Sequence, residues 1–304
     1  MPLYGLFELI YKIKKFDFLG KQLGSFLDLV DRLNILPTND VYCNSPIFIT
    51  SIGWRCGSTL LQRIICSSSN TIIWGEPFER LFFLGRLGSI LSNIKSESNE
   101  EFLWTIQESN KLESKWIANL NPGVSNLVNG CRAFIEESLA HPSKKLGFKI
   151  WGAKWVRVSG YYARFLQYLY PNAKFLILFR HPLSSYQSYK GKKWSAIYPY
   201  LWIKTSVQFF YYWSNLAKSF IVNKDKLNCK FVMYEDLVNS PYEEVNKLSN
   251  FLDLQLDVSV INKRRGASIH KKKISCFSKL YYFIFSKKIY ENLRDIYGKN
   301  TKVI

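Results

Sequence analysis

The chain has 304 residues, of which 47% are hydrophobic and 16% aromatic, so it is long enough to bury a sizeable core in one or two domains. Its 42 Lys and Arg residues outnumber its 23 Asp and Glu residues, and the formal net charge of +19 indicates an anionic partner. A nucleotide, an acidic polymer and a membrane surface all meet that description.

The six cysteines include no Cys-x-x-Cys pair, so the sequence predicts neither a disulfide framework nor a zinc site. A run of about eighteen apolar residues, which a membrane-spanning helix requires, does not occur. Charged residues interrupt the apolar residues near the N-terminus, so no secretory leader is expected. Together these features predict a cytoplasmic protein.

Residues 1–44 form an aromatic, leucine-rich and basic N-terminal extension. Apolar residues recur there at helical spacing in two places, namely Phe7, Ile10 and Tyr11, then Phe26, Leu27 and Val30. We therefore expect a helical extension, either a pair of helices packed on the main domain or a helix lying at a membrane surface.

From residue 45 onward, short apolar runs alternate with amphipathic segments. The predicted strands are 46–51, 71–74, 147–152, 175–179 and 229–234. This alternation predicts an α/β fold in three layers, with a central parallel sheet of the P-loop nucleotide-binding type. The domain is expected to span 45–266 with helical insertions at 78–145 and 195–222, and a basic aromatic tail, 267–304, is expected to pack on it.

Four charged residues lie within a few residues after predicted strands: Arg55, Glu76, Lys154 and Arg180. The carboxyl ends of parallel strands share one edge of the sheet, and ligands of open α/β sheets bind beyond that edge. The four side chains are therefore expected to converge on one functional site.

The first predicted strand leads into a helix through a glycine-bearing turn. Gly53 and Gly57 permit tight turns and close approach of an anion to the backbone. The helix N-terminus, with Ser58, attracts an anion, and Arg55 can form charge-assisted bonds to its oxygens. The triphosphate pattern G-x-x-x-x-G-K-[ST] is not matched, because Ser58 occupies the lysine position. A capped turn with a solvated Arg55 is the alternative.

A second pattern surrounds the fourth predicted strand. The run 171–182 reads Pro-Asn-Ala-Lys, then an apolar strand, then Arg180-His181-Pro182. Ser188 lies about two turns into the helix that follows, at about 3.6 residues a turn. Arg180 and Ser188 can hold one phosphate if the intervening loop folds back. The alternative is that Arg180 forms an ion pair at the end of the strand and that Ser188 is a serine on the surface of the helix.

These two patterns, in this order, resemble the family of sulfotransferases that use 3′-phosphoadenosine 5′-phosphosulfate (PAPS). The turn is similar to the family's 5′-phosphosulfate loop, G-x-x-R-S-G-T-T, with Cys56 at the usual Ser position. The second run is similar to the family's P-N-A-K, strand, R-D-P pattern, with His181 at the usual Asp position. The resemblance covers roughly residues 46–266.

The resemblance implies that Arg55 and the amides of Ser58 and Thr59 hold the 5′-phosphosulfate of PAPS, and that Arg180 and Ser188 hold its 3′-phosphate. A basic run ending at Gly266 is similar to the run that closes over the 3′-phosphate in some members, although a solvated basic segment is the alternative. The donor-binding residues implied in full are Gly53, Trp54, Arg55, Cys56, Gly57, Ser58, Thr59, Leu60, Arg180, Ser188, Arg264, Arg265 and Gly266.

Catalytic residues follow from the same resemblance. Glu76, in the context Gly75-Glu76-Pro77, resembles the glutamate that acts as base in tyrosine- and carbohydrate-type members, whereas none of the three histidines is placed like the base of other members. Lys154 resembles the lysine that steadies charge on the sulfonate, and Arg55 assists it. An ion pair between Glu76 and an arginine such as Arg80 is the alternative for Glu76.

The reaction implied is transfer of a sulfuryl group from PAPS to a hydroxyl, without metal, leaving adenosine 3′,5′-bisphosphate. A glycan acceptor is favoured, because aromatic and basic residues of the insertion suit a sugar face: Lys190, Lys192, Lys193, Trp194 and Trp202. Contact of the basic aromatic termini with a membrane surface is also expected, and nucleic acid is not expected as a partner.

Two other functions remain open from the sequence. A nucleotide kinase on the same fold would need the loop lysine and would depend on magnesium. A non-catalytic protein that binds an anionic polymer would account for the charge, and it would bind with a steep dependence on salt.

Overall fold

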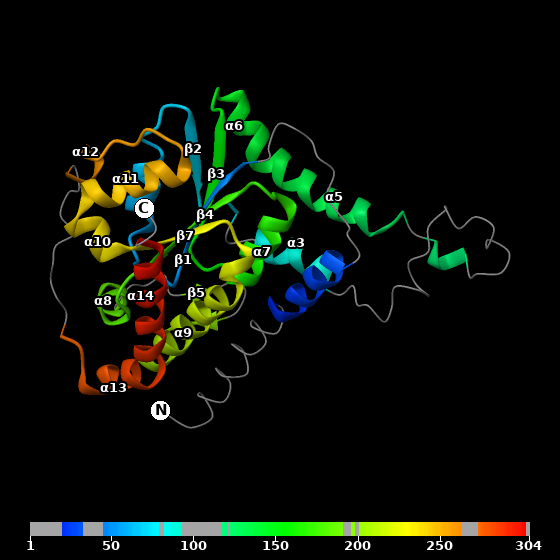
Figure 1. Cartoon of the computed structure of the whole chain (residues 1–304). Coiled ribbons are helices and arrows are strands. Elements are labelled where there is room, and N and C mark those ends of the chain that lie inside the picture. The colour runs from blue at the N-terminus through cyan, green and yellow to red at the C-terminus, as the bar shows by residue number, and fades with distance from the viewer. Residues whose placement is uncertain are drawn as a thin grey trace.

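A computed structural model of the chain describes residues 20–32, 45–78, 82–92, 117–120, 122–190, 196–197, 201–262 and 273–301. These residues form a parallel sheet of five strands with helices on both faces (Figure 1). The predicted α/β class with a central parallel sheet is confirmed.

The strands of the sheet are β1 (Ile47–Ser51), β2 (Thr71–Gly75), β3 (Ile150–Trp155), β4 (Lys174–Phe179) and β7 (Cys229–Met233). Their spatial order is β2-β3-β1-β4-β7, and all neighbours pair in parallel. The central strand β1 lies between β3 and β4. From β1 the chain continues to β2 and β3 on one side of this strand, and then passes to β4 and β7 on the other side. Such a reversal opens a crevice beyond the carboxyl ends of the central strands, where ligands of this fold class bind.

The third strand begins three residues later than the sequence predicted, at Ile150 and not at residue 147. Gly147 has a positive φ of 86° and donates its N–H to the carbonyl of Lys144, so it ends the preceding helix instead of starting a strand. As a result Lys154 lies inside β3, with a buried side chain, and not in the loop after it.

One face of the sheet is covered by α2 (Ser58–Ile65), α10 (Tyr234–Asn239), α11 (Pro241–Leu252) and α12 (Ser259–Asn262). Strand side chains alternate between the two faces, and this face presents aliphatic residues such as Ile49 and Leu178. They pack against Leu61 of α2 and Val245 and Leu248 of α11, all of which are buried. This contact fixes the start of α2 against the end of β1.

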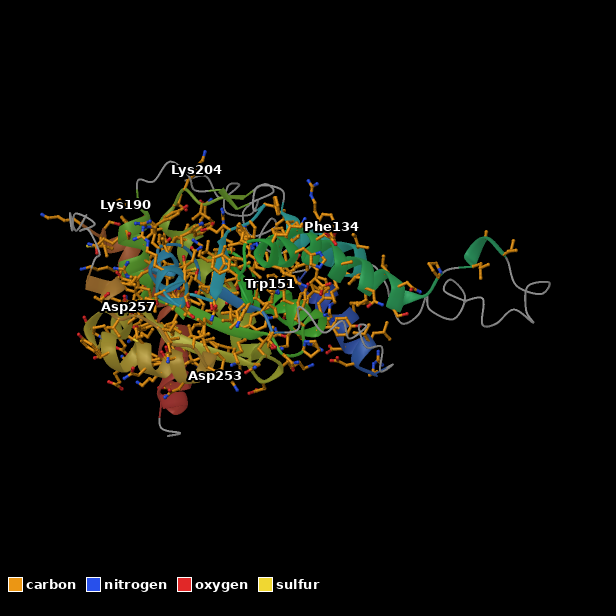
Figure 2. All side chains as sticks on the ribbon, turned by 90° about the horizontal axis from the view of Figure 1, so that it is seen from above. Phe134, Trp151, Lys190, Lys204, Asp253 and Asp257 are labelled. Atoms are coloured by element: carbon orange, nitrogen blue, oxygen red, sulfur yellow. The ribbon has the colours of Figure 1, made fainter. Side chains whose placement is uncertain are left out.

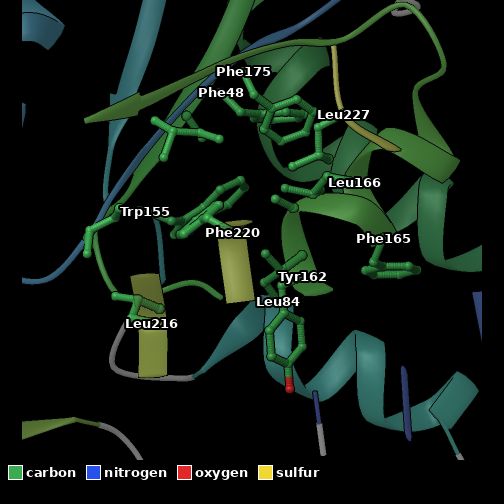
Figure 3. Close-up of a cluster of buried hydrophobic side chains, with 14 of the residues drawn as sticks. Phe48, Leu84, Trp155, Tyr162, Phe165, Leu166, Phe175, Leu216, Phe220 and Leu227 are labelled. Atoms are coloured by element: carbon green, nitrogen blue, oxygen red, sulfur yellow. The ribbon is translucent and has the colours of Figure 1, made fainter. Parts of the chain in front are cut away.

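The opposite face carries a larger and more aromatic core (Figure 3). Phe48 of β1 lies in its centre, with ring centroids 5.7 Å from Trp155 and 5.2 Å from Phe175. The helices that cover this face are α3 (Phe83–Ser92), α5 (Val124–Ile135), α7 (Gly160–Leu169), α9 (Ser206–Asn223) and a helix over residues 20–32.

The helix over residues 20–32 is part of the domain core. Phe26, Leu27 and Val30, the apolar residues predicted at helical spacing, are buried. The guanidinium of Arg164 in α7 fastens the helix through ion pairs of 2.8 Å to Asp28 and 2.6 Å to Asp31. The apolar face of this helix is therefore covered by the domain, and residues 1–19 and 33–44 lie outside the described ranges.

Several of the remaining elements pack around this core. The expected helical insertion at 195–222 contains a short hairpin of β5 (Ala196–Ile197) and β6 (Leu201–Trp202) before α9 begins. The tail forms α13 (Cys276–Phe285) and α14 (Lys287–Thr301), which pack on α9, and α14 also contacts β7. The other helical segments are a 3-10 turn over Ile117–Asn119, a π-helical turn over Glu136–Ala140, α6 (His141–Lys145), α8 (Pro182–Tyr189) and a 3-10 turn over Lys224–Lys226.

Gly152 of β3 allows the close approach of β1, which suggests a test of the sheet register. A Cβ at this position would lie 1.9 Å from the carbonyl oxygen of Ile47 in the neighbouring strand. We expect Gly152→Ala to lower the free energy of unfolding by about 1–3 kcal/mol, because backbone atoms must shift. Urea denaturation measures this loss.

The matched control is Gly130→Ala in α5, where an added Cβ meets nothing within 4 Å. This variant should keep or raise stability by up to about 1 kcal/mol, because alanine favours helix over glycine. Equal stability of the Gly152→Ala variant and the parent chain would contradict the pairing of β1 with β3.

Candidate active site

The loop between β1 and α2 turns tightly at the carboxyl end of β1. Gly53, Arg55 and Gly57 have positive φ angles of 83°, 61° and 95°. The hydroxyl of Ser51 donates to the carbonyl of Gly53 at 2.8 Å and so fixes the first turn. Glycine is required at position 57, because a Cβ there would lie 2.3 Å from the ring of Tyr234.

The amino end of α2 points amide groups at the space beyond β1. Gly57 occupies the N-cap position of α2, and no side chain caps the helix. Within the described part of the chain, the amides of Gly57, Ser58 and Thr59 have no carbonyl acceptor, whereas those of Leu60 and Leu61 donate to the carbonyl of Gly57. The free amides and the helix dipole suit an anion.

Trp54 and Cys56 turn their side chains into the core. The Trp54 ring lies 5.2 Å from each of Tyr189 and Tyr212. The Cys56 thiol donates to the carbonyl of Ile52 at 3.1 Å, and burial raises its pKa to about 12, so it remains a neutral thiol. Only the backbone atoms of these two residues can therefore face a ligand.

The two sequence patterns lie in direct contact. The Nε of Arg55 donates to Oγ of Ser188 at 3.0 Å, and Nη1 of Arg180 donates to the carbonyl of Arg55 at 3.1 Å. Arg180 directly follows β4, and Ser188 lies near the end of α8. Residues about 125–133 positions apart in sequence thus form one cluster beyond β1 and β4.

Arg180 is held by residues that follow β7. Its guanidinium carbon lies 4.4 Å from the centroid of the Tyr234 ring, which is cation–π geometry. The Nε of Arg180 is buried and has no partner in the described part of the structure. An unpaired buried donor on a cation costs free energy, so this atom favours an anionic ligand.

His181 occupies the position at which the resemblance expects aspartate. Its Nδ1 accepts from the amide of Leu183 at 3.3 Å and so caps α8, while its own amide donates to the Glu235 carboxylate at 3.0 Å. The ring packs 4.7 Å from Tyr290 of α14. Burial is the main cause that lowers the pKa of His181, and the charge of Arg294 adds to it.

A second cluster lies at the ends of β2 and β3. The amide of Glu76 donates to the carbonyl of Lys154 at 2.9 Å, and the carboxylate pairs with the Lys154 ammonium at 3.1 Å. Arg157 approaches the other carboxylate oxygen at 3.8 Å. Glu76 has a positive φ of 49°, a strained conformation that the sheet edge holds in place. The arginine weighed as its partner, Arg80, lies outside the described residues.

Arg157 connects the two clusters, and the sequence did not single it out. Its guanidinium lies 5.9 Å from the centroid of Trp54, the neighbour of Arg55, while it also contacts Glu76. Arg157 follows β3 by two residues, so the strand-end rule would have found it. Placing the third strand at 147–152 hid this signal.

The four residues expected to converge do so as two contacting pairs, Arg55 with Arg180 and Glu76 with Lys154. Arg264, Arg265 and Gly266 lie outside the described residues, as do Lys192, Lys193 and Trp194. Lys190 and Lys204 are exposed and lie at the margin of the molecule (Figure 2), whereas Trp151 is buried.

The described residues show neither a metal-binding cluster nor a membrane-spanning helix. They contain no group of three or more His, Cys, Asp or Glu side chains arranged to hold a metal ion. None of their helices combines the length and the apolar character that crossing a membrane requires.

A family model described as the sulfotransferase family matches residues 46–258. This chain belongs to the sulfotransferase family. The match begins one residue before β1 and ends within the segment that follows α11, so it includes both clusters of the site. No curated protein matches the sequence at a significant level.

Solved structures of other sulfotransferases are similar to this one at low identity. The sulfotransferase domain of the Synechococcus PCC 7002 olefin synthase is 17% identical, with a TM-score of 0.45, and the match covers 86% of this chain and 90% of that one. The Alicyclobacillus acidocaldarius sulfotransferase is 14% identical, with a TM-score of 0.43 and coverage of 83% and 96%. A Mycobacterium tuberculosis sulfotransferase is 13% identical, with a TM-score of 0.43 and coverage of 88% and 81%.

His181 should make the stability of this sulfotransferase sensitive to acid. Its pKa is lowered in the folded state, so the unfolded chain binds a proton more readily and stability falls as the pH drops below about 6.5. We expect His181→Asn, which can still cap α8, to reduce this loss. Urea denaturation at a series of pH values between about 7 and 5 measures the slope.

The control is His141→Asn, which removes a surface histidine that pairs with Glu137 at 2.8 Å. An equal change of slope in both variants would contradict the assignment to His181.

Proposed function

We propose that this protein transfers a sulfuryl group from PAPS to an acceptor hydroxyl. Membership of the sulfotransferase family supports the reaction class. The observation that carries the assignment of the donor is the contact of Arg55 with Ser188, supported by the bond from Arg180 to the Arg55 backbone. These contacts join the residues that would hold the two ends of the donor.

The chemistry of this cluster fits a molecule with two phosphate groups. Arg55 and the amides of Gly57, Ser58 and Thr59 would hold the 5′-phosphosulfate, because the start of α2 presents amides that favour an anion. Arg180 and Ser188 would hold the 3′-phosphate, and the buried Nε of Arg180 would gain the acceptor it lacks among the described residues. We also propose that Arg264, Arg265 and Gly266 help to hold the 3′-phosphate.

In the proposed reaction the acceptor oxygen bonds to sulfur as the bond from sulfur to the phosphate oxygen breaks. Glu76 would accept the proton of the hydroxyl, since its carboxylate lies at the open edge of the sheet. Lys154 and Arg55 would stabilise negative charge on the sulfonate and on the leaving phosphate. Such positioning and charge stabilisation are the main components of catalysis in transfers of this type.

Arg157 would position Glu76. It approaches the carboxylate oxygen opposite to the one that Lys154 holds, so the two cations fix the plane of the carboxylate between them. Its packing over Trp54 would keep the base in a set relation to the phosphosulfate loop.

For the acceptor we propose a glycan. The support is the basic margin near the carboxyl end of α8, where Lys190 and Lys204 are exposed, together with the aromatic content of the segment between them. Aromatic faces and basic side chains suit sugar rings that carry acidic groups.

Replacing Arg180 tests the donor site. We expect Arg180→Ala to weaken binding of adenosine 3′,5′-bisphosphate at least tenfold, about 1.4 kcal/mol, because a charge-assisted contact with the 3′-phosphate is lost. Calorimetry with and without magnesium measures the affinity, and we expect the metal to make no difference.

Arg63→Ala is the matched control, since Arg63 is exposed in the last turn of the same α2 helix whose first turn would bind the donor. It should bind the nucleotide as the parent chain does. Binding that is equally weakened in both variants, or that depends on magnesium, would contradict the proposed donor site.

Replacing Glu76 tests the base. We expect Glu76→Gln to lower the rate of sulfuryl transfer by a factor of about 10²–10⁴, because the proton of the hydroxyl loses its acceptor. Nucleotide affinity should remain that of the parent chain. The assay supplies labelled PAPS and a glycan array, and calorimetry reports the affinity.

Glu137→Gln, a change at an exposed carboxylate in the π-helical turn, is the control and should leave the rate unchanged. An active Glu76→Gln variant would rule out this base. Sulfation of a phenol or a peptide with no sulfated sugar would rule out the glycan while leaving the reaction class intact.

A further inference from the structure

The helix α13 has apolar side chains on two opposite faces. One face packs on α9, where Tyr282 lies 6.1 Å from Phe210 and Phe285 lies 5.6 Å from Tyr211, measured between ring centroids. The hydroxyl of Ser214 in α9 also donates to the carbonyl of Phe285 at 2.7 Å. A helix that is apolar all round is normally covered on every side.

The other face of α13 is open. Its exposed fractions are 71% for Phe277, 51% for Leu280, 63% for Phe283 and 60% for Ile284. Residues at spacings of three, four and seven lie on one side of a helix, so these four side chains form a continuous strip. Other exposed apolar residues of the described chain are distributed over different elements, as is normal for single surface residues.

Lysines surround this strip. Lys273 precedes α13, Lys279 borders the strip on the helix, and Lys287 and Lys288 follow it. The Lys287 ammonium lies 4.4 Å from the centroid of Phe283, so charge and apolar surface are directly adjacent. The α13 sequence contains no acidic residue, and Glu291, one turn into α14, pairs with Lys287 at 3.9 Å.

We propose that the open strip of α13, formed by Phe277, Leu280, Phe283 and Ile284, docks on an anionic membrane surface. Apolar side chains would enter the boundary between headgroups and acyl chains, while the lysines would meet the negatively charged headgroups. A second copy of this chain fits less well, because a two-fold contact through the strip would bring the same lysines of both copies together.

The helix that carries the open strip, α13, contacts a neighbour of the candidate active site. The hydroxyl of Tyr282, on the covered side of α13, lies 3.4 Å from Nε2 of His181, the neighbour of Arg180. In Figure 1, α13 lies at one extremity of the molecule, beside α9 and α14. The strip uses none of the residues proposed for catalysis, so the docking can be tested independently of sulfuryl transfer.

Sedimentation with lipid vesicles tests the proposal on the whole chain. We expect binding to vesicles that contain phosphatidylserine, weaker binding when salt is added, and little binding to vesicles of phosphatidylcholine alone. The double variant Phe277→Ser/Phe283→Ser should lose affinity at least about tenfold, because the exposed rings no longer enter the bilayer.

Tyr242→Ser is the matched control, since Tyr242 is an aromatic residue of α11 with an exposed fraction of 69%. It should bind vesicles as the parent chain does, and Arg180→Ala should also bind normally. Absence of binding, equal binding to neutral vesicles, or equal binding by the double variant would overturn the proposal. Dimers in light scattering that dissociate in the double variant would also overturn it, in favour of a second copy.

A second measurement does not depend on the folding of the double variant. Cys276 is exposed at the start of α13 and can carry an environment-sensitive fluorophore, once Cys43 and the exposed Cys66 are replaced by Ser. We expect its emission to shift to the blue with phosphatidylserine vesicles. An unchanged spectrum at vesicle concentrations that sediment the protein would overturn the assignment to α13.

Discussion

The site depends on one contact between two loops. The guanidinium of Arg180, which follows β4, donates to the backbone carbonyl of Arg55, which follows β1. The parallel pairing of β1 with β4 brings these loops to the same edge, and the stacking of Arg180 on Tyr234 adds a third loop, from the end of β7. Because Arg180 contacts backbone, the side chain of Arg55 is left to reach Ser188. The relative position of these loops is thus set by the fold itself.

The edge of the sheet carries more positive charge than its own carboxylates can balance. Arg55, Lys154, Arg157 and Arg180 lie there, and the Glu76 carboxylate pairs with Lys154 and Arg157. Like charges gathered in one place repel and destabilise the fold, a cost that cation–π contacts with Trp54 and Tyr234 offset in part. An arrangement of this kind is preorganised for an anion, since binding one removes the repulsion and needs little movement.

Features of the fold and the site that depend on a short stretch of sequence could be predicted, whereas features that depend on tertiary packing could not. The run Phe175–Phe179 predicts a buried strand because all its residues are apolar. The glycines of the loop predict the turn because glycine adopts positive φ angles whatever its tertiary contacts. Glu76 could be found because it ends a strand of ordinary apolar residues. The third strand was misplaced, because Gly147 belongs to the end of a helix and an apolar run alone does not fix where a strand begins. Arg157 was missed for the same reason, and its position over Trp54 depends on packing between residues about a hundred positions apart.

The C-terminal helices lie beyond the part of the chain that the family model matches, yet they contact the site. Tyr282 and Tyr290 pack on His181, where the resemblance to other sulfotransferases expects aspartate. A carboxylate enclosed by these rings would lose hydration, whereas a neutral imidazole keeps the capping bond to Leu183 and packs between the rings. The substitution and the aromatic tail are therefore complementary. The loop that carries Arg180 is therefore held on one side by β4 and on the other by α13 and α14, through the contacts of Tyr282 and Tyr290 with His181.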